Sequence, residues 1–124
     1  MKTIRWVLLI GLLGLPAFAD DLAGPVRVID GDTIVIGETH IRLWGIDAFE
    51  IDQPCLKQDR SEWACGEMAR MAMQALTKGE VVSCSDRGRD RYGRTVAICT
   101  VGTSDVGSMM VNLGLALDWP HFSH

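Results

Sequence analysis

VRVIDGDTIVIGETHIRLWG, residues 26–45, is the stretch of the chain that decides the fold. Three runs rich in β-branched residues, 26–29, 33–36 and 40–45, are separated by short polar segments that contain glycine. Runs of this kind between glycine-containing turns are typical of adjacent antiparallel strands. The stretch therefore predicts a three-stranded β-meander.

The third run also makes a prediction about individual side chains. Successive side chains of a strand point to opposite faces of the sheet. If Ile41 and Leu43 face the core, Arg42 and Trp44 lie on the other face. We therefore expect Arg42 on a surface rather than in the interior.

The second half of the chain predicts two more strands and two helices. Apolar residues recur at helical spacing between residues 67 and 78, and Gly79 follows as a stop signal: Met68, Met71, Ala72, Ala75 and Leu76. Residues 81–84 and 94–101 are expected to form strands around a charged loop. Thr103 or Ser104 would cap a second, shorter helix that ends at Gly114. The predicted class is α+β, mainly β, with five strands, one helix between strands 3 and 4 and a short helix after strand 5.

Four cysteines are distributed over the chain, at positions 55, 65, 84 and 99. Three pairings are possible in principle. The pairing Cys55 with Cys65 and Cys84 with Cys99 is favoured, because each bond closes a short segment and the second joins two predicted neighbouring strands. A zinc site is the alternative, but no two cysteines have the close spacing that structural zinc sites show. Residues 49–65 are expected to be a surface loop pinned by its own disulfide.

The N-terminus has the pattern of a secretory signal peptide. Lys2 and Arg5 precede an apolar run, and small residues at 17 and 19 suit signal peptidase. A membrane helix is the alternative, but Pro16 interrupts a run that is shorter than the roughly 20 residues needed. We expect residues 1–19 to be removed, leaving one domain, residues 20–124, in a periplasmic or secreted protein with no membrane segment.

Charge limits the kind of nucleic-acid binding that the domain can support. The whole chain has 12 basic and 16 acidic side chains, for a formal net charge of −4. Removal of Lys2 and Arg5 with the signal peptide would leave 10 basic side chains, and the net charge would be −6. This balance disfavours broad electrostatic attachment to nucleic acid.

Three short motifs far apart in the chain carry related chemistry. They are residues 30–33 (DGDT), then Arg42 with Asp47 and Glu50, and residues 90–94 (DRYGR). If the fold brings them together, carboxylates and guanidinium groups face one small volume. Hydrolysis of a phosphodiester with a hard metal ion requires these groups.

The elements and motifs resemble the staphylococcal nuclease-like (thermonuclease) family, whose domain is an OB-type barrel. Residues 28–33 match the strand-turn motif around the family's first metal-binding aspartate. Arg42, Asp47 and Glu50 match its arginine, aspartate and glutamate, and residues 92–94 match its Tyr-Gly-Arg hairpin. The resemblance covers about residues 26–119. It implies a five-stranded OB-type barrel and a metal-dependent nuclease that hydrolyses DNA and RNA with little sequence preference.

The resemblance also implies a calcium site. Asp32 and Asp47 would bind Ca²⁺ through carboxylate oxygens, the main-chain carbonyl of Ala48 would lie nearby, and Glu50 would contact the water shell of the ion. Ca²⁺ prefers oxygen ligands, and a site outside the cytoplasm can bind as weakly as about 10⁻⁴ to 10⁻³ M.

Catalytic roles follow for three residues. Arg42 and Arg94 would hold the phosphate oxygens on which charge develops, because guanidinium groups form paired hydrogen bonds with them. Glu50 is implied as the general base that takes a proton from the attacking water. The expected products end in a 3′-phosphate and a 5′-hydroxyl.

Four further residues are candidates for substrate binding. Tyr92 would line the phosphate, Arg87 and Arg89 would guide the phosphate backbone, and Trp119 would stack on a base. Each has a structural alternative, since a charged hairpin can simply be solvated and a tryptophan often packs. Asp90 with Arg94 can likewise be a plain surface ion pair.

Two departures from the family pattern leave an alternative function open. Phe49 stands where relatives commonly have proline, which makes the turn before Glu50 less rigid. Relatives also continue into a long C-terminal helix, whereas this sequence ends at His124. We therefore expect a domain truncated at its C-terminus. We also expect it to act as a monomer. The alternatives are a non-catalytic OB-type module that binds nucleic acid or protein, and a shortened, poorly folded product.

Overall fold

The N-terminal strands follow the predicted meander. In the computed structural model, which describes residue 3 and residues 21–119, β2 (Val26–Asp30), β3 (Thr33–Ile36) and β4 (Thr39–Leu43) are successive strands. Each pairs antiparallel with the next, β2 with β3 and β3 with β4. The meander prediction is confirmed.

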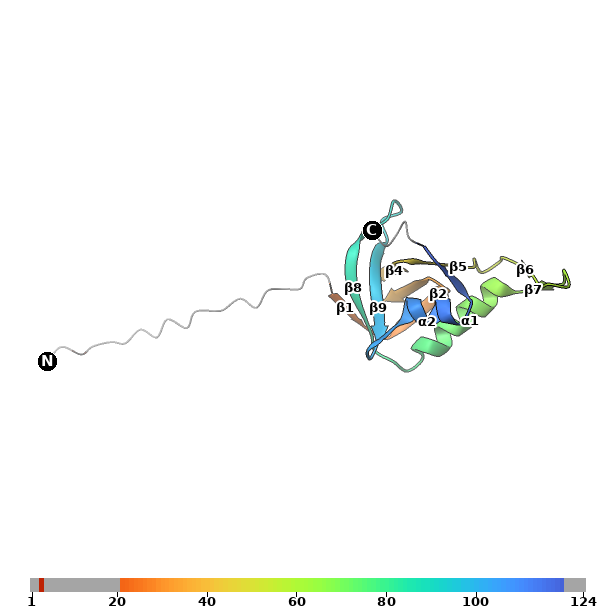
Figure 1. Cartoon of the computed structure of the whole chain (residues 1–124). Coiled ribbons are helices and arrows are strands. Elements are labelled where there is room, and N and C mark those ends of the chain that lie inside the picture. Colours follow the sequence, from red (N-terminus) through yellow and green to blue (C-terminus); the bar gives the residue numbers. More distant parts are fainter. Residues whose placement is uncertain (1–2, 4–20, 120–124) are drawn as a thin grey trace.

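A second hairpin completes a curled sheet (Figure 1). β8 (Val82–Arg89) and β9 (Thr95–Val101) pair antiparallel, and β9 then pairs in parallel with β4. The strand order is β1-β8-β9-β4-β3-β2. The five predicted strands thus form the centre of an OB-type α+β fold. Two strands that were not predicted, β1 (Asp21–Gly24) and β10 (Ser104–Asp105), are added to it.

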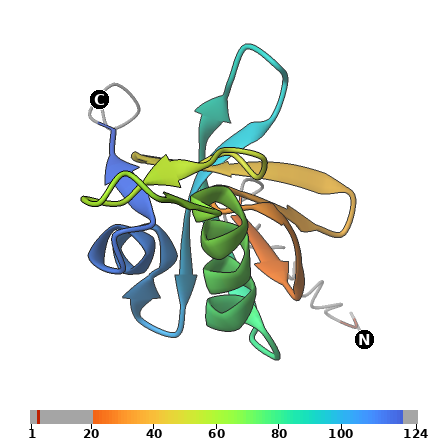
Figure 2. The ribbon, with the colours of Figure 1, turned by 90° about the vertical axis from the view of Figure 1, so that its right-hand side faces the viewer.

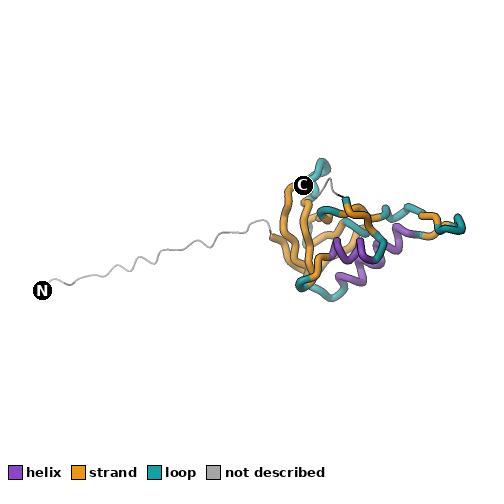
Figure 3. Tube along the Cα trace, viewed as in Figure 1, coloured by secondary structure: helices purple, strands orange, loops and turns teal. Residues whose placement is uncertain are grey.

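Two small sheets lie outside this main sheet. β5 (Ile46–Ala48) pairs with β11 (Ala116–Asp118), and β6 (Cys55–Leu56) pairs with β7 (Glu62–Trp63). The region predicted as an irregular loop therefore contains the short β6–β7 hairpin. Figure 3 shows this hairpin projecting away from the barrel.

Helix α1 (Cys65–Thr77) stands beside the sheet (Figure 2), and the predicted buried face is right only in part: Ala72 and Leu76 pack against the core cluster as predicted. Ala69 and Met73 are fully buried, whereas Met68 and Met71 are 47% and 50% exposed. Both sets have helical spacing, so spacing alone does not choose between the two neighbouring faces. The small side chain of Ala69 must face the sheet, because the main chain at Gly31 comes close to it, as described below.

Helix α2 (Val106–Asn112) begins one or two residues later than predicted. Its N-cap is Asp105, whose side chain accepts a hydrogen bond from the N–H of Ser108 at 2.8 Å. The predicted caps, Thr103 and Ser104, lie before it. The helix buries Val106 and Met110 in the barrel.

Both predicted disulfides are present. Cys84 and Cys99 face each other in the β8–β9 register, and their Cα atoms are 4.1 Å apart. Both belong to the apolar cluster that fills the barrel. Cys55 and Cys65, with Cα atoms 5.6 Å apart, join the β6–β7 hairpin to the start of α1.

Within the described residues no helix is long and apolar enough to cross a membrane. The predicted signal peptide, residues 1–19, lies almost wholly outside the described part of the chain. Its removal, and the domain limits 20–124, therefore stay predictions.

Candidate active site

The acidic turn between β2 and β3 is seated against two other elements. A Cβ added at Gly31 would lie 2.7 Å from the Cβ of Ala69 in α1 and 2.8 Å from that of Ala48 in β5. Only glycine permits this approach. The turn is closed by the N–H of Asp32, which donates to Oδ1 of Asp30 at 3.1 Å. Asp32 is thereby fixed in a buried position.

Burial changes the chemistry of Asp32. The residue is only 7% exposed, and its Oδ2 accepts the N–H of Ala48 at 2.9 Å. The pKa of Asp32 is raised to about 7, first by burial and then by the neighbouring Asp30, against the opposing charge of Arg42. The ionised carboxylate is therefore short of compensating positive charge.

Arg42 is buried, so the prediction of a surface position was wrong. It is 7% exposed, and its Nη1 donates to the carbonyl of Leu43 at 2.9 Å. Its Nη2 lies 3.3 Å from Oδ2 of Asp32 and 3.4 Å from Oδ1 of Asp47. Strand alternation correctly predicted the face, but the acidic turn and β5 cover that face and enclose the guanidinium.

Arg94 reaches the same place from the β8–β9 hairpin. Oδ2 of Asp90 accepts its Nε–H at 2.7 Å, and Oδ1 of Asp90 accepts the main-chain N–H groups of Arg94 and Tyr92, each at 2.9 Å. At its other end, Nη1 of Arg94 lies 3.5 Å from Oγ1 of Thr33. That hydroxyl donates to Oδ1 of Asp32 at 3.1 Å. A chain of polar contacts thus connects the hairpin to the acidic turn.

These residues share one cavity of about 250 Å³. Eight residues line it: Asp30, Asp32, Arg42, Asp47, Ala48, Glu50, Arg94 and Trp119. The fold therefore brings all three sequence motifs together. Every residue that the sequence singled out for metal binding or catalysis is among the lining residues.

Three of the four predicted substrate-binding residues do not line the cavity, and two of these, Arg87 and Arg89, make contacts elsewhere. The guanidinium of Arg87 is 4.9 Å from the ring centre of Trp44, and that of Arg89 pairs with Oδ2 of Asp86 at 2.9 Å. Neither arginine lines the cavity. These interactions involve only β8 and the residue that follows β4, so a substrate role for Arg87 and Arg89 stays a prediction.

The two predicted aromatic residues occupy different positions. Trp119 lines the cavity, and its main-chain N–H donates to the carbonyl of Gly45 at 2.8 Å. Tyr92 is 69% exposed, with the guanidinium of Arg94 5.5 Å from its ring centre. Tyr92 therefore touches the site through Arg94 instead of lining it.

The donor set fits a hard divalent cation. Carboxylates of Asp32 and Asp47 face the same volume beside the main chain of Ala48, and Arg42 compensates the buried charge of Asp32 only in part. Over the described ranges, no three His, Cys, Asp or Glu side chains gather closely enough to enclose a metal by themselves. A cation here would thus need main-chain oxygen and water as further ligands, which Ca²⁺ accepts.

Three residues of the site were missed or undervalued from sequence. Thr33 connects Arg94 to Asp32, Asp90 orients Arg94, and Gln53 bonds the main chain of Glu50. Asp90 and Thr33 adjoin the motifs, so their position in the turns was a usable signal. Gln53 stands in a stretch without periodicity, and nothing in its sequence surroundings identifies it.

The barrel and its cavity define a class: a small OB-type domain whose acidic turn, third strand and arginine-bearing hairpin build one polar site. Residues 40–122 match the family described as Staphylococcal nuclease homologue. The match covers more than half of the 124 residues, so the chain belongs to the staphylococcal nuclease family.

Individual relatives agree with this membership. The chain is 36% identical over 102 residues to succinoglycan biosynthesis protein ExoI of Rhizobium meliloti (strain 1021), covering 81% of this chain and 53% of that protein. It is 28% identical to micrococcal nuclease of Shigella flexneri, covering 90% and 66% of the two chains. An uncharacterized endonuclease of Escherichia coli O157:H7 is 33% identical, with coverages of 88% and 69%. The chain thus spans between about half and two thirds of the length of these relatives.

Proposed function

We propose that the protein is a Ca²⁺-dependent nuclease that hydrolyses DNA and RNA with little sequence preference and leaves 3′-phosphate ends. The observation that carries this proposal is the single cavity shared by Asp32, Asp47, Glu50, Arg42 and Arg94. Relatives named micrococcal nuclease and endonuclease support the same reading.

Asp32 and Asp47 would hold the cation, together with the main-chain carbonyl of Ala48 and water held by Glu50. Bound Ca²⁺ would act as a Lewis acid that draws charge from the phosphoryl oxygens. The buried, pKa-raised carboxylate of Asp32 favours this arrangement, because a neighbouring cation stabilises its ionised form.

Both arginines line the cavity and would bind the phosphate there. Arg42 is fixed by Asp32 and Asp47, and Arg94 is fixed by Asp90. Both guanidinium groups are therefore oriented before the substrate arrives. Donors that need no reorganisation stabilise developing charge best, and attack by water places extra negative charge on the equatorial oxygens.

Glu50 is the proposed general base. It lines the cavity and is exposed to solvent, so a water molecule can reach it. Its carboxylate would take the proton as the water attacks phosphorus, and the leaving group would be the 5′-oxygen of the next nucleotide. Trp119, which lines the same cavity, would stack against a base.

We further propose that the domain works as a monomer in the periplasm or outside the cell, after loss of residues 1–19. The two disulfides favour an oxidising compartment, because disulfides persist there. The substrate-guiding roles of Tyr92, Arg87 and Arg89 are proposed as secondary.

The first test is cleavage of single-stranded DNA by the oxidised protein, in Ca²⁺ and in excess chelator. Cleavage is expected in Ca²⁺ and not in chelator. Glu50→Gln should reduce turnover by about 10² to 10⁴ because the general base is lost. Equal cleavage in both conditions, or no cleavage by protein that shows a cooperative thermal transition, contradicts the proposal.

The same experiment separates the alternative of a non-catalytic OB-type binding module. Phe49, in place of the family proline before Glu50, is the feature that favours this alternative. Binding of single-stranded DNA without cleavage, unaffected by chelator and by Glu50→Gln, would support it. Such a result would assign the cavity to ligand binding alone.

A further inference from the structure

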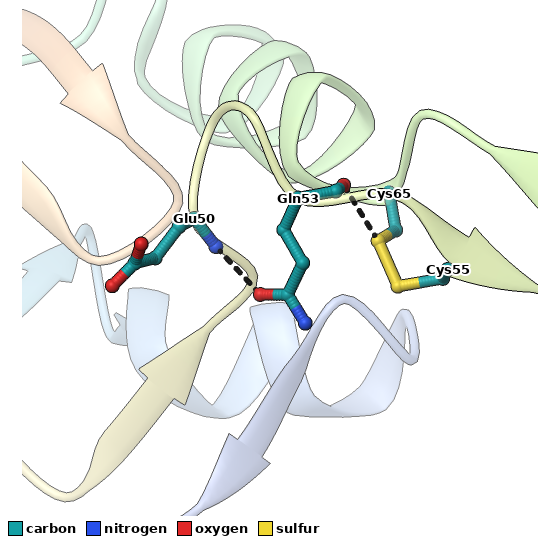
Figure 4. The surroundings of a disulfide bond; sticks show 4 residues. All are labelled: Glu50, Gln53, Cys55 and Cys65. Atoms are coloured by element: carbon teal, nitrogen blue, oxygen red, sulfur yellow. Dashed lines mark hydrogen bonds between the residues drawn. A yellow bond between two sulfur atoms is a disulfide. The ribbon is translucent and has the colours of Figure 1, made fainter.

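The loop that carries Glu50, residues 49–54, is closed at two points by Gln53. The N–H of Gln53 donates to the carbonyl of Glu50 at 2.8 Å, and the N–H of Glu50 donates to Oε1 of Gln53 at 3.2 Å. Figure 4 shows the carboxylate of Glu50 pointing away from Gln53. The two bonds therefore hold the main chain of Glu50 and leave its carboxylate available.

Gln53 itself contacts the first turn of α1. Its main-chain carbonyl accepts the N–H of Gly66 at 3.3 Å and lies 3.1 Å from Sγ of Cys65. The second is a packing contact, since a disulfide sulfur has no hydrogen to donate. A Cβ at Gly66 would collide with the carbonyl of Glu50. The 49–54 loop and the helix are thus in direct contact.

The Cys55–Cys65 disulfide ties the end of this loop to the same turn of α1. Cys55 follows Gln53 by two residues, and Cys65 is fully buried. Neither cysteine belongs to the apolar cluster of the barrel, whereas Cys84 and Cys99 do. Opening the Cys55–Cys65 bond would therefore remove the covalent attachment of the loop and leave the Cys84–Cys99 bond of the barrel core in place.

The two disulfides also differ in access to solvent. Cys55 is partly exposed, whereas Cys84 and Cys99 are 3% and 1% exposed. Thiol–disulfide exchange requires a thiolate to reach one of the sulfur atoms. In the folded protein a dithiol reductant should therefore open Cys55–Cys65 first.

We propose that the Cys55–Cys65 disulfide and Gln53 form a redox-sensitive clamp that positions Glu50, an inference that rests on the nuclease function proposed above. Gln53 is a positioning residue in this clamp. In the reducing step a dithiol gives two electrons and two protons to the disulfide, the S–S bond breaks, both cysteines become thiols and the dithiol becomes a disulfide. The 49–54 loop then loses a covalent attachment, Glu50 is held less closely, and turnover falls.

The clamp is tested by replacing its disulfide. Cys55→Ala with Cys65→Ala should reduce kcat in Ca²⁺ by about 10- to 100-fold, because small misplacements of a reacting group are costly. KM for single-stranded DNA should stay within about 3-fold, since both arginines keep their anchors. Wild-type protein treated with dithiothreitol until two thiols can be alkylated should match the double variant. An unchanged kcat in folded, reduced protein overturns the clamp.

The matched control removes the other disulfide. Cys84→Ala with Cys99→Ala lies outside the site and should leave kcat unchanged below the melting temperature of that variant. A kcat loss equal to that of the Cys55–Cys65 variant would show a general loosening of the protein, and it would contradict a clamp specific to Glu50.

Gln53 is tested by a pair of side chains of similar length. Gln53→Met removes the acceptor for the Glu50 N–H and should lower kcat by about 10-fold with little change in KM. Gln53→Glu keeps an acceptor oxygen and should restore most of kcat. Equal activity of both variants with wild type overturns the positioning role.

Amide exchange separates failure of the clamp from failure of the nuclease proposal. The N–H groups of Glu50 and Gln53 should exchange faster after reduction, while those of β3 and β9 should not change. If oxidised wild-type protein does not cleave DNA, the nuclease proposal fails, and this exchange result still decides whether the clamp exists. Unchanged exchange at Glu50 and Gln53 would overturn it.

Discussion

The two halves of the cavity are held in different ways. Asp32 and Arg42 are each 7% exposed and lie on strands or turns packed into the barrel. Glu50 is exposed on a loop, and the side chain of Arg94 is 32% exposed at the end of a hairpin. The barrel half depends on core packing, whereas the loop half depends on a few local contacts.

Because of this difference, we expect that some substitutions change activity without changing stability, and that others do the reverse. Changes in the loop half should reduce turnover with little effect on the free energy of unfolding. Changes in the barrel half should act on unfolding first. The disulfides follow the same division, with Cys84–Cys99 in the apolar cluster and Cys55–Cys65 beside Glu50.

The largest loss of activity without a loss of stability is expected for Arg94→Lys. The ammonium group cannot reproduce the guanidinium fork, so kcat should fall by about 10² to 10³, similar to the loss of one donor to a developing oxyanion. The melting temperature should change by no more than about 2 °C, since the side chain is partly exposed. Steady-state kinetics and thermal melting on one preparation test both statements, and a large fall in melting temperature would assign Arg94 to the barrel half.

The converse effect is expected from Cys84→Ala with Cys99→Ala. The bond closes a segment with a sequence separation of 15. For a loop of this length the chain-entropy model gives about 3 kcal/mol of stabilisation. Urea unfolding should show a loss of this order in the double variant, while Cys55→Ala with Cys65→Ala should lose less. A larger loss of unfolding free energy in the Cys55–Cys65 variant would contradict the division into a barrel half and a loop half.

The smallest effect is expected at the anchor of Arg94. Partial burial acts to raise the pKa of Asp90, but hydrogen bonds from the main chain and side chain of Arg94 and from the N–H of Tyr92 outweigh it and lower the pKa. A lowered folded-state pKa means that the ionised group stabilises the protein above its unfolded pKa, near 3.9, and that this contribution is lost as pH falls below it. Asp90→Asn should destabilise the protein by about 1 kcal/mol at pH 7.

The pH dependence sharpens that prediction. The difference in unfolding free energy between wild type and Asp90→Asn should shrink as the pH falls below about 4, because Asp90 of the unfolded chain then binds a proton before Asp90 of the folded protein does. Urea unfolding at pH 7 and at pH 3 measures it. A difference that stays constant over this range would show that Asp90 acts through packing alone.

Much of the fold was predictable because strands and turns depend mainly on the local sequence. β-Branched runs and glycine turns gave the meander, and facing positions on two predicted strands gave the Cys84–Cys99 pair. Short strands that exist only by pairing with distant residues were not predictable, such as β5 with β11. The buried face of α1 was predicted only in part, because Met68 and Ala69 are equally compatible with helical spacing.

The candidate site was predictable as a set of residues but not as an environment. The resemblance to a known family identified the carboxylates and arginines of the site. The burial of Arg42 depends on which elements cover its strand, and local alternation carries no information about that. The bond between Gln53 and Glu50 depends on how a loop without periodicity folds against α1.

The parallel pairing of β4 with β9 has a consequence for the order in which the molecule assembles. It joins positions far apart in the chain, with Arg42 opposite Val96. Such long-range pairs form late, because the entropy of closing the intervening chain is paid before they are made. This pair brings the strand of Arg42 beside the strand that follows Arg94. A nascent or partly folded chain therefore keeps Arg42 and Arg94 apart, and no single phosphate can be bound by both.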